Sequence, residues 1–229
     1  DKNNKKRKNP RSYYVFTLDE KETHKNASFF TYELGIKEHM INRGYLCKAS
    51  SLLPMNSLKV SLLKVAGIKV EDDVFIAPEV TIDPVIRGWI RFRKGCSIGW
   101  GVRCFNHLFE EDGKIVIGYI DVGEEASIGG FVSLAPGVTI GTRADIGAEV
   151  KLAPGVSIGN YAKIGAVSLV MPFVSIGEGA EVMMGSVVSE NVPPHAKVQG
   201  NPAKIVSEKI RDRKPKLDLI INPNNIESA

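Results

Sequence analysis

Aliphatic residues recur every sixth position through the second half of the chain. Two residues before these positions, from Ala126 to Ser186, the sequence holds only Ala, Val or Ser, and Gly is the most common residue directly after them. An α-helical pattern repeats every 3.6 residues and a plain strand every two, so neither explains a period of six. The aliphatic positions are Val122, Ile128, Leu134, Ile140, Ile146, Leu152, Ile158, Ile164, Val170, Ile176, Val182 and Val188.

A period of six with small residues between the aliphatic ones predicts short strands joined by tight turns. Three such units form a coil of eighteen residues, which is why APGVTIG at Ala135 returns as APGVSIG at Ala153. This is the hexapeptide signature of a parallel β-helix, whose coils stack about 4.8 Å apart. We expect four unbroken coils with the aliphatic residues inside. We also expect the glycine after each aliphatic residue to serve a corner that needs positive φ.

Upstream, the same repeat is present but interrupted. The step of six links Val70 to Ile82, slips across DPVIRGWI, and resumes from Phe92 to Cys104 in register with Val122. The next position in register, 110, is a glutamate, which does not fit an aliphatic interior. Residues 105–114 are therefore predicted to leave the wall as an excursion, and excursions from a repeat scaffold are where function usually resides.

Residues 52–68 have an amphipathic pattern that ends at Gly67, and they predict a helix that caps the N-terminal end of the coils. A solenoid needs a cap because an open end exposes unpaired strand edges. The alternative is a basic, apolar helix lying on a membrane surface. We divide the chain into an N-terminal extension (1–50), a capping helix with the β-helix (51–206) and a C-terminal tail (207–229). The sequence gives no account of the extension beyond its basic tail.

Composition and charge indicate the number of domains and the cellular compartment. The 229 residues are 43% hydrophobic, which suits one large domain with appendages. Residues 1–11 contribute +5 to the formal net charge of +4, so the rest of the chain carries −1 and the basicity belongs to the tail. Three cysteines without a CxxC pattern favour a reducing compartment, and no apolar run is long enough to span a bilayer. We expect a cytoplasmic protein.

One of the four histidines, His107, lies in the excursion beside Asn106. We interpret the two as the catalytic site, with His107 as a general base, because a neutral imidazole can accept a proton near pH 7. The alternative is a solvated loop histidine beside acidic residues. His195 is interpreted as a surface residue near the C-terminal end, and His24 and His39 are given no role. A zinc site on neighbouring coils needs several histidines, so no metal is expected.

Two segments carry a resemblance to a known family. Residues 185–206 (GSVVSENVPPHAKVQGNPAKIV) and residues 113–148 resemble the hexapeptide-repeat acyltransferases, particularly the maltose and galactoside O-acetyltransferase group. FNH, residues 105–107, falls where that family has its catalytic histidine. The resemblance implies a left-handed parallel β-helix and a homotrimer. It also implies acetyl-CoA as co-substrate in a groove between neighbouring subunits, with direct attack by the acceptor assisted by His107.

The same resemblance implies positions that contact CoA. Gly130 and Ala148 match the pantetheine contacts when counted from the histidine, and Lys204 matches a basic residue near the CoA phosphates. Two additional coils precede the closing segment, so counting from the C-terminal end gives Ala166 and Met184 instead. The extra coils displace Lys204 by roughly 10 Å along the stack.

These features predict a CoA-dependent O-acetyltransferase acting on a sugar or polysaccharide precursor. Trp89, Trp100 and Phe105 are candidates for stacking on a sugar ring. The alternatives are N-acetylation of an amino sugar, use of another acyl-CoA, or a non-catalytic trimeric scaffold or binding protein. The basic tail makes peripheral contact with an anionic membrane a further possibility. No nucleic-acid partner is expected, because stacking aromatics do not interleave with the basic residues.

Overall fold

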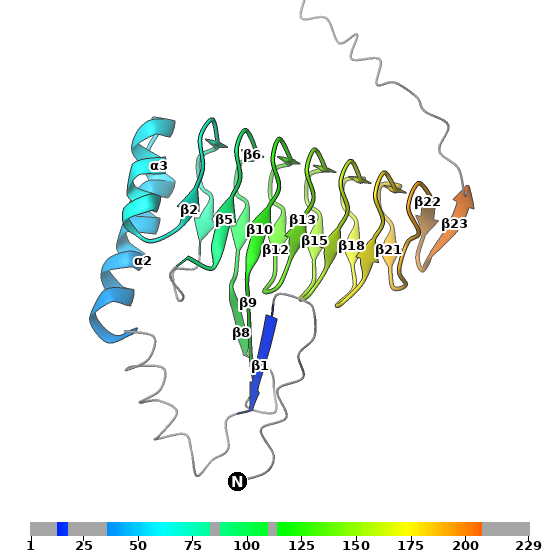
Figure 1. Cartoon of the computed structure of the whole chain (residues 1–229), viewed down its shortest axis with the longest axis horizontal. Helices are drawn as coiled ribbons and strands as arrows, with labels where there is room; N and C mark the ends of the chain where they lie inside the picture. The colour runs from blue at the N-terminus through cyan, green and yellow to red at the C-terminus, as the bar shows by residue number, and fades with distance from the viewer. Residues whose placement is uncertain (1–12, 18–35, 83–87, 110–113, 208–229) are drawn as a thin grey trace, which may run out of the picture.

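The computed structural model describes residues 13–17, 36–82, 88–109 and 114–207. The chain winds into a row of parallel β coils with two helices, α2 (Ile36–Leu52) and α3 (Asn56–Val65), at its N-terminal end (Figure 1). An antiparallel pair, β22 (Lys197–Gly200) and β23 (Ala203–Ser207), lies at the other end. The predicted left-handed parallel β-helix with an N-terminal helical cap is confirmed.

Each coil contributes one short strand to each of three parallel sheets, which we call faces 1, 2 and 3 in chain order. Face 1 contains β2 (Lys69–Val70), β5 (Ile90–Phe92), β10 (Ile120–Val122), β13 (Thr139–Ile140), β16 (Ser157–Ile158) and β19 (Ser175–Ile176). Face 2 contains β3 (Phe75–Ile76), β6 (Ser97–Ile98), β11 (Ser127–Ile128), β14 (Asp145–Ile146), β17 (Lys163–Ile164) and β20 (Glu181–Val182), and ends with β22 and β23. Face 3 contains β4 (Thr81–Ile82), β7 (Arg103–Cys104), β12 (Ser133–Leu134), β15 (Lys151–Leu152), β18 (Leu169–Val170) and β21 (Val187–Val188).

The register is the one that the repeat predicts. Val122 pairs with Ile140 on face 1, and Leu134 pairs with Leu152 on face 3, in each case eighteen residues away. All twelve aliphatic positions are buried, as are the small residues two positions before them. The interrupted upstream repeat also keeps its register, because Phe92 pairs with both Val70 and Val122. The core is therefore one continuous aliphatic column.

The prediction that the glycines after the aliphatic positions adopt positive φ is wrong. Positive φ instead falls on the third residue after the aliphatic one, including non-glycine residues such as Phe131 (58°) and Val167 (60°). Gly129 is needed for a different reason. A Cβ placed there would lie 2.6 Å from the backbone nitrogen of Ala148 in the next coil. At this corner the coils stack too closely for any side chain.

The cap is built from two helices rather than the single helix predicted over residues 52–68. Helix α2 crosses the boundary that the sequence suggested between residues 50 and 51, and α3 packs on the first coil. The Asn56 side chain accepts a hydrogen bond from the Ile76 amide (2.9 Å) and donates one to the Val74 carbonyl (2.8 Å). Buried Lys59 donates to the Ile76 carbonyl (2.9 Å). These side chains replace the neighbouring strand that the first coil lacks.

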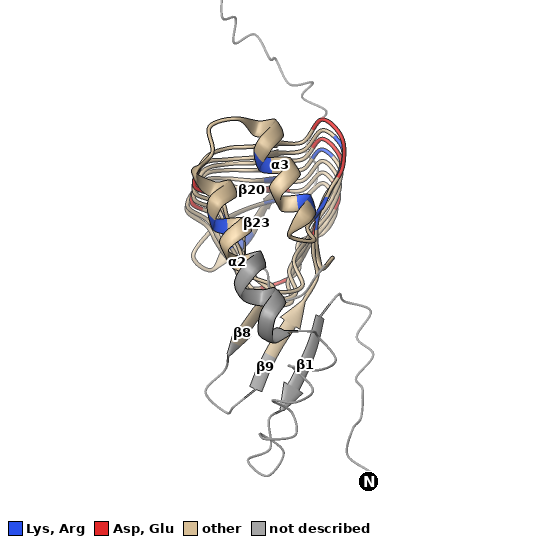
Figure 2. Ribbon diagram, turned by 90° about the vertical axis from the view of Figure 1, so that its left-hand side faces the viewer, with Lys and Arg blue, Asp and Glu red and all other residues tan. Residues whose placement is uncertain are grey.

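Charged residues gather along one edge of the prism, which Figure 2 shows in a view along the coils. This edge joins faces 1 and 2, and it includes the Arg143–Glu125 ion pair at 2.7 Å. On the outside of face 2, Asp145, Lys163 and Glu181 follow one another in register, and Lys197 forms an ion pair with Glu181 at 3.2 Å. Alternating charges of this kind are typical of a solvated surface.

Candidate functional site

The excursion predicted from the sequence is an antiparallel hairpin that projects from the corner between faces 3 and 1. Strand β8 (His107–Phe109) pairs with β9 (Lys114–Gly118), and β1 (Tyr13–Thr17) pairs with the other edge of β9. The resulting three-stranded sheet extends below the prism (Figure 1). The tip at residues 110–113 lies outside the described residues. The departure is longer than the predicted residues 105–114, because the chain rejoins the wall only at Ile120.

The foot of the hairpin is hydrogen-bonded to the next coil and is closed by a bond between its own two sides. The Phe105 amide donates to the Leu134 carbonyl of the next coil (2.9 Å), and the Gly118 amide donates to the Asn106 carbonyl (3.0 Å). Asn106 itself is fully buried. His107 follows at once, opposite Ile117 of β9. Its side chain is half-buried, with Nδ1 buried. The backbone around His107 is thus anchored by hydrogen bonds to a rigid scaffold.

The four positions matched to pantetheine contacts form a column along the corner between faces 2 and 3. Gly130, Ala148, Ala166 and Met184 occupy equivalent places in successive coils. The carbonyls of the first three accept hydrogen bonds of 2.8–2.9 Å from the coil that follows each of them. His107 leaves the opposite edge of face 3. Six residues of extended chain separate the two corners, roughly 15–20 Å, so a single chain does not bring His107 and this column together.

A groove of about 470 Å³ lies on face 3, beside the corner that carries this column. Arg103 and Lys151 bring positive charge to it, and Phe131 is 57% exposed at its rim. The sequence reasoning missed these residues. The signal was present, because the residue directly before each buried aliphatic position must point outward on a strand. The groove is lined by Arg103, Phe131, Ser133, Glu149, Lys151, Val167, Ser168 and Leu169.

Lys204, the residue matched to the CoA phosphates, lies on β23 at the C-terminal end of the prism. Its Nζ is 3.8 Å from Glu190 Oε1, and both side chains are exposed. An exposed pair at this distance contributes about 0–1 kcal/mol at most. The acidic partner offsets the charge that a phosphate site would need.

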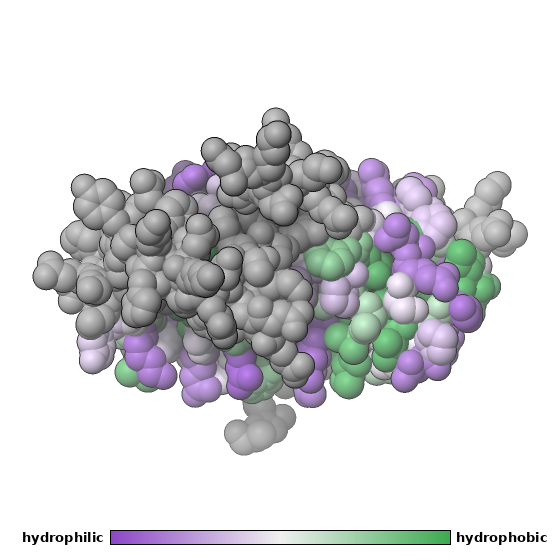
Figure 3. Space-filling view, turned by 90° about the horizontal axis from the view of Figure 1, so that it is seen from below, coloured by the Kyte–Doolittle hydropathy of each residue, from purple (hydrophilic) through white to green (hydrophobic). Residues whose placement is uncertain are grey.

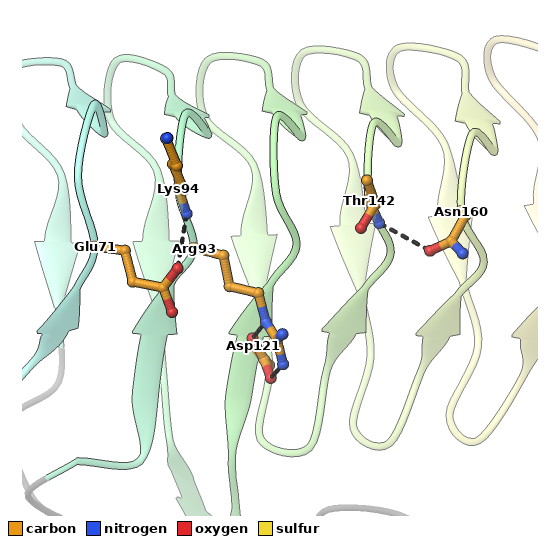
Figure 4. A network of polar contacts seen from close by, with 6 residues as sticks. All are labelled: Glu71, Arg93, Lys94, Asp121, Thr142 and Asn160. Carbon is orange, nitrogen blue, oxygen red and sulfur yellow. Dashed lines mark hydrogen bonds and ion pairs between the residues drawn. The ribbon is translucent and has the colours of Figure 1, made fainter.

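A network of polar contacts joins successive coils near face 1 (Figure 4). Arg93 donates two hydrogen bonds to Asp121, of 2.9 and 2.8 Å. These bonds and the charge of Asp121 raise the pKa of Arg93 above its ordinary value. Between the coils that contain β13 and β16, the Thr142 amide donates to Asn160 Oδ1 at 2.9 Å. A groove of about 290 Å³ runs beside these contacts. Its opposite charges neutralise each other, so the network has a structural role.

The remaining titratable candidates are His195 and the three cysteines, of which Cys104 lies in the core directly before Phe105 at the foot of the hairpin. His195 is exposed near the C-terminal end, as predicted. Cys47, Cys96 and Cys104 are buried and form no disulfide with one another, and burial raises the pKa of both Cys96 and Cys104 to about 12. Within the described residues, no three His, Cys, Asp or Glu side chains are placed to hold a metal ion. No helix in this part of the chain is long and apolar enough to cross a membrane.

Comparison with known proteins identifies the fold. No protein-family model and no curated protein matches the chain. Among solved structures, it is similar to a hexapeptide transferase family protein from Anaplasma phagocytophilum (TM-score 0.53, 24% identity, covering 63% of this chain and 80% of that one). It is also similar to a hexapeptide-repeat acetyltransferase from Vibrio cholerae in complex with acetyl-CoA (TM-score 0.53, 17% identity, 79% and 92%). A third is an N-acyltransferase from Bacillus cereus in complex with dTDP and CoA (TM-score 0.50, 21% identity, 66% and 90%).

Sequence identity below 25% makes these similarities evidence for the fold alone. They agree with the resemblance drawn from residues 113–148 and 185–206. The chain has the left-handed β-helix fold found in hexapeptide-repeat acyltransferases.

Proposed function

We propose that this protein transfers an acetyl group from acetyl-CoA to a hydroxyl group of a sugar or polysaccharide precursor, with His107 as the general base. The observation that carries the proposal is the place of His107. It is half-buried at the foot of a hairpin that is hydrogen-bonded to the coils. Support also comes from the shared fold of a Vibrio cholerae acetyltransferase solved with acetyl-CoA. The reaction belongs to the cytoplasm, where CoA thioesters are used and reduced cysteines such as those here persist.

The proposed reaction is a direct transfer. Because Nδ1 of His107 is buried, Nε2 is the ring nitrogen that meets the acceptor. Nε2 accepts the proton of the acceptor hydroxyl as its oxygen attacks the thioester carbonyl carbon. The tetrahedral intermediate then collapses with cleavage of the carbon–sulfur bond, and the imidazolium returns the proton to the thiolate. The products are an acetyl ester and free CoA thiol, and His107 is neutral again.

Asn106 acts in this proposal through the backbone. Its side chain is fully buried, and its carbonyl accepts the Gly118 amide hydrogen bond that closes the hairpin. It is therefore a positioning residue for His107 rather than a contact for the substrate. Holding a base within a few tenths of an ångström of its place is a large part of rate acceleration.

The site is completed between subunits in the proposed enzyme. His107 and the column containing Gly130 and Ala148 lie at opposite edges of face 3. We infer that His107 of one copy meets that column on a neighbouring copy in a homotrimer. Exposed apolar residues at both edges support this arrangement. They are Phe131, Val167 and Met184 on one side and Met171 and Phe173 on the other. Seen from below, the C-terminal coils expose hydrophobic residues among polar ones (Figure 3).

CoA would then lie along the groove of face 3, where Arg103 and Lys151 supply positive charge for its phosphates. The small residues Gly130 and Ala148 allow the pantetheine arm to approach the backbone, as Ala166 does one coil further on. Lys204 contributes less, because Glu190 lies beside it. The β-helix and its cap over residues 51–206 form the catalytic unit of this proposal.

The test is thiol release from acetyl-CoA in the presence of neutral sugars, amino sugars and sugar nucleotides. His107→Ala and His107→Asn are expected to lower acceptor-dependent release by about 10²–10⁴-fold, with unchanged unfolding temperature. His195→Ala is the matched control, since it removes an exposed histidine far from the hairpin. Release only with amino sugars would assign N-acetylation. Absence of acetyl-CoA binding by calorimetry would instead assign a scaffold, and full activity in His107→Ala would refute the proposed base.

A further inference from the structure

A second pocket, which we call the N-terminal pocket, lies where α3 meets the first coils on face 1. Its volume is about 490 Å³, within the range of pockets that hold small molecules. Among the described residues that line it none is acidic, whereas the groove beside Arg93 also contains Asp121. It is lined by Lys64, Gly67, Ile68, Lys69, Gly88, Trp89 and Tyr119.

An aromatic pair forms one wall of the N-terminal pocket. Trp89 precedes β5 and Tyr119 precedes β10, and the Ile120 amide donates to the Trp89 carbonyl (2.8 Å), so the two rings occupy matching places in consecutive coils. Their centroids are 4.2 Å apart with an interplanar angle of 21°. The stack is a flat, rigid surface, with a polar hydroxyl or indole edge on each ring. Such a surface accommodates the apolar face of a sugar ring.

Two ammonium groups lie in the same pocket. Lys64 is in the last turn of α3 and Lys69 is on β2, the edge strand of face 1. The Lys69 side chain lies over Gly88, where an added Cβ would be 3.3 Å from Lys69 Cε. Within the described part of the chain, neither lysine has an acidic partner at ion-pair distance. Two uncompensated positive charges beside an aromatic wall favour a ligand that carries negative charge.

We propose that the N-terminal pocket binds a saccharide bearing a carboxylate or phosphate group. The ring would stack on Trp89 and Tyr119, and the anionic group would accept hydrogen bonds from Lys64 and Lys69. Tyr119 lies two residues beyond Ile117, the backbone partner of His107, so the pocket begins at the foot of the hairpin. This ligand is the acetyl acceptor, a step of the inference that rests on the proposed function. Binding in the pocket does not depend on it.

Calorimetry with the full chain tests the inference, using glucuronic acid, glucose 6-phosphate and glucose as probes. We expect at least one anionic probe to bind about tenfold or more tightly than glucose. We also expect the double variant Lys64→Gln/Lys69→Gln to lose about tenfold in affinity for it, because each ammonium contributes a charge-assisted hydrogen bond. Lys48→Gln is the matched control. It removes an exposed lysine of α2 and should change the affinity less than twofold.

Fluorescence supplies an independent readout of the aromatic wall. The chain has two tryptophans, and Trp100 is 46% exposed at another corner. In the Trp100→Phe variant, Trp89 is the remaining tryptophan. Its fluorescence emission should change when the anionic saccharide binds. The better anionic probe identifies the recognised group as carboxylate or phosphate.

The inference fails if glucose and the anionic probes bind equally, or if no probe binds to protein that still binds acetyl-CoA. It also fails if the double lysine variant keeps full affinity, or if Trp89 emission does not respond. These results are separate from the fate of the proposed function. Saccharide binding without thiol release would support the pocket and refute the proposed acetyltransferase activity. His107-dependent thiol release, together with unchanged saccharide affinity in Lys64→Gln/Lys69→Gln, would support the activity and refute the pocket.

Discussion

Replacing Gly129 with alanine should destabilise the β-helix far more than replacing Gly185. A Cβ on Gly129 would lie 2.6 Å from the Ala148 nitrogen, whereas ordinary contact begins at 3.4 Å, so the coils must separate by about 0.8 Å at this corner. The Gly129 amide donates a 2.7 Å hydrogen bond to the Ile146 carbonyl. A separation of that size would break it. Losing one buried hydrogen bond and overpacking the corner together cost about 2–4 kcal/mol.

Gly185 is the matched control for this comparison. Its φ is +68°, and an added Cβ would meet nothing within 4 Å, so alanine there suffers only the strain of a left-handed backbone. That strain costs roughly 1–2 kcal/mol. At about 2–4 °C per kcal/mol for a domain of this size, Gly129→Ala should lower the Tm by roughly 4–16 °C and Gly185→Ala by about half as much.

Thermal unfolding followed by far-UV circular dichroism measures both changes, and urea midpoints provide the free energies. Equal losses in the two variants would show that close stacking at Gly129 costs no more than the backbone strain at Gly185. A Tm in Gly129→Ala that matches the unsubstituted protein would refute the argument altogether.

Three further outcomes follow from the interior and the polar network. Burial lowers the pKa of Lys59 below 10.5. Between the lowered pKa and 10.5 the unfolded chain therefore binds more protons than the folded chain, and stability rises with pH across that interval. Urea midpoints measured across this pH range should lose this part of the rise in Lys59→Met. Asp121→Asn should cost about 0.5–1 kcal/mol, less in 1 M salt, because the Arg93 partner is 39% exposed; a double-mutant cycle with Arg93→Gln measures it. Cys96 and Cys104, with thiol pKa values raised to about 12, should resist iodoacetamide at pH 8 until the protein unfolds, as mass spectrometry would show.

The excursion shows how far the sequence reaches into the site. Glu110 at an in-register position was enough to predict that the chain leaves the wall there, and His107 was the histidine within that departure. The pairing of β1 with β9 could not be predicted, because nothing in the sequence of residues 13–17 indicates which strand, about a hundred residues away, they pair with. The burial of Asn106 likewise depends on how the two sides of the hairpin close at its foot, where the Gly118 amide donates to the Asn106 carbonyl.

Pockets were harder to predict than coils, for a related reason. The Trp89–Tyr119 stack joins residues thirty positions apart, because the hairpin is inserted into the coil between them. Lys64 reaches the same pocket from a helix outside the repeat. No local sequence pattern predicts that these three side chains lie together, because each one taken alone looks like an ordinary surface residue.

The sequence by itself determined the β-helix, its eighteen-residue coil and its buried aliphatic column. A period of six repeated twelve times leaves one way to bury every aliphatic residue, because identical coils satisfy one another's backbone hydrogen bonds. Only the tertiary structure decided which segments meet at the hairpin and in the N-terminal pocket. The pairing of β1 with β9 and the approach of Lys64 to Trp89 and Tyr119 join residues far apart in the sequence, and the repeat contains no signal for either.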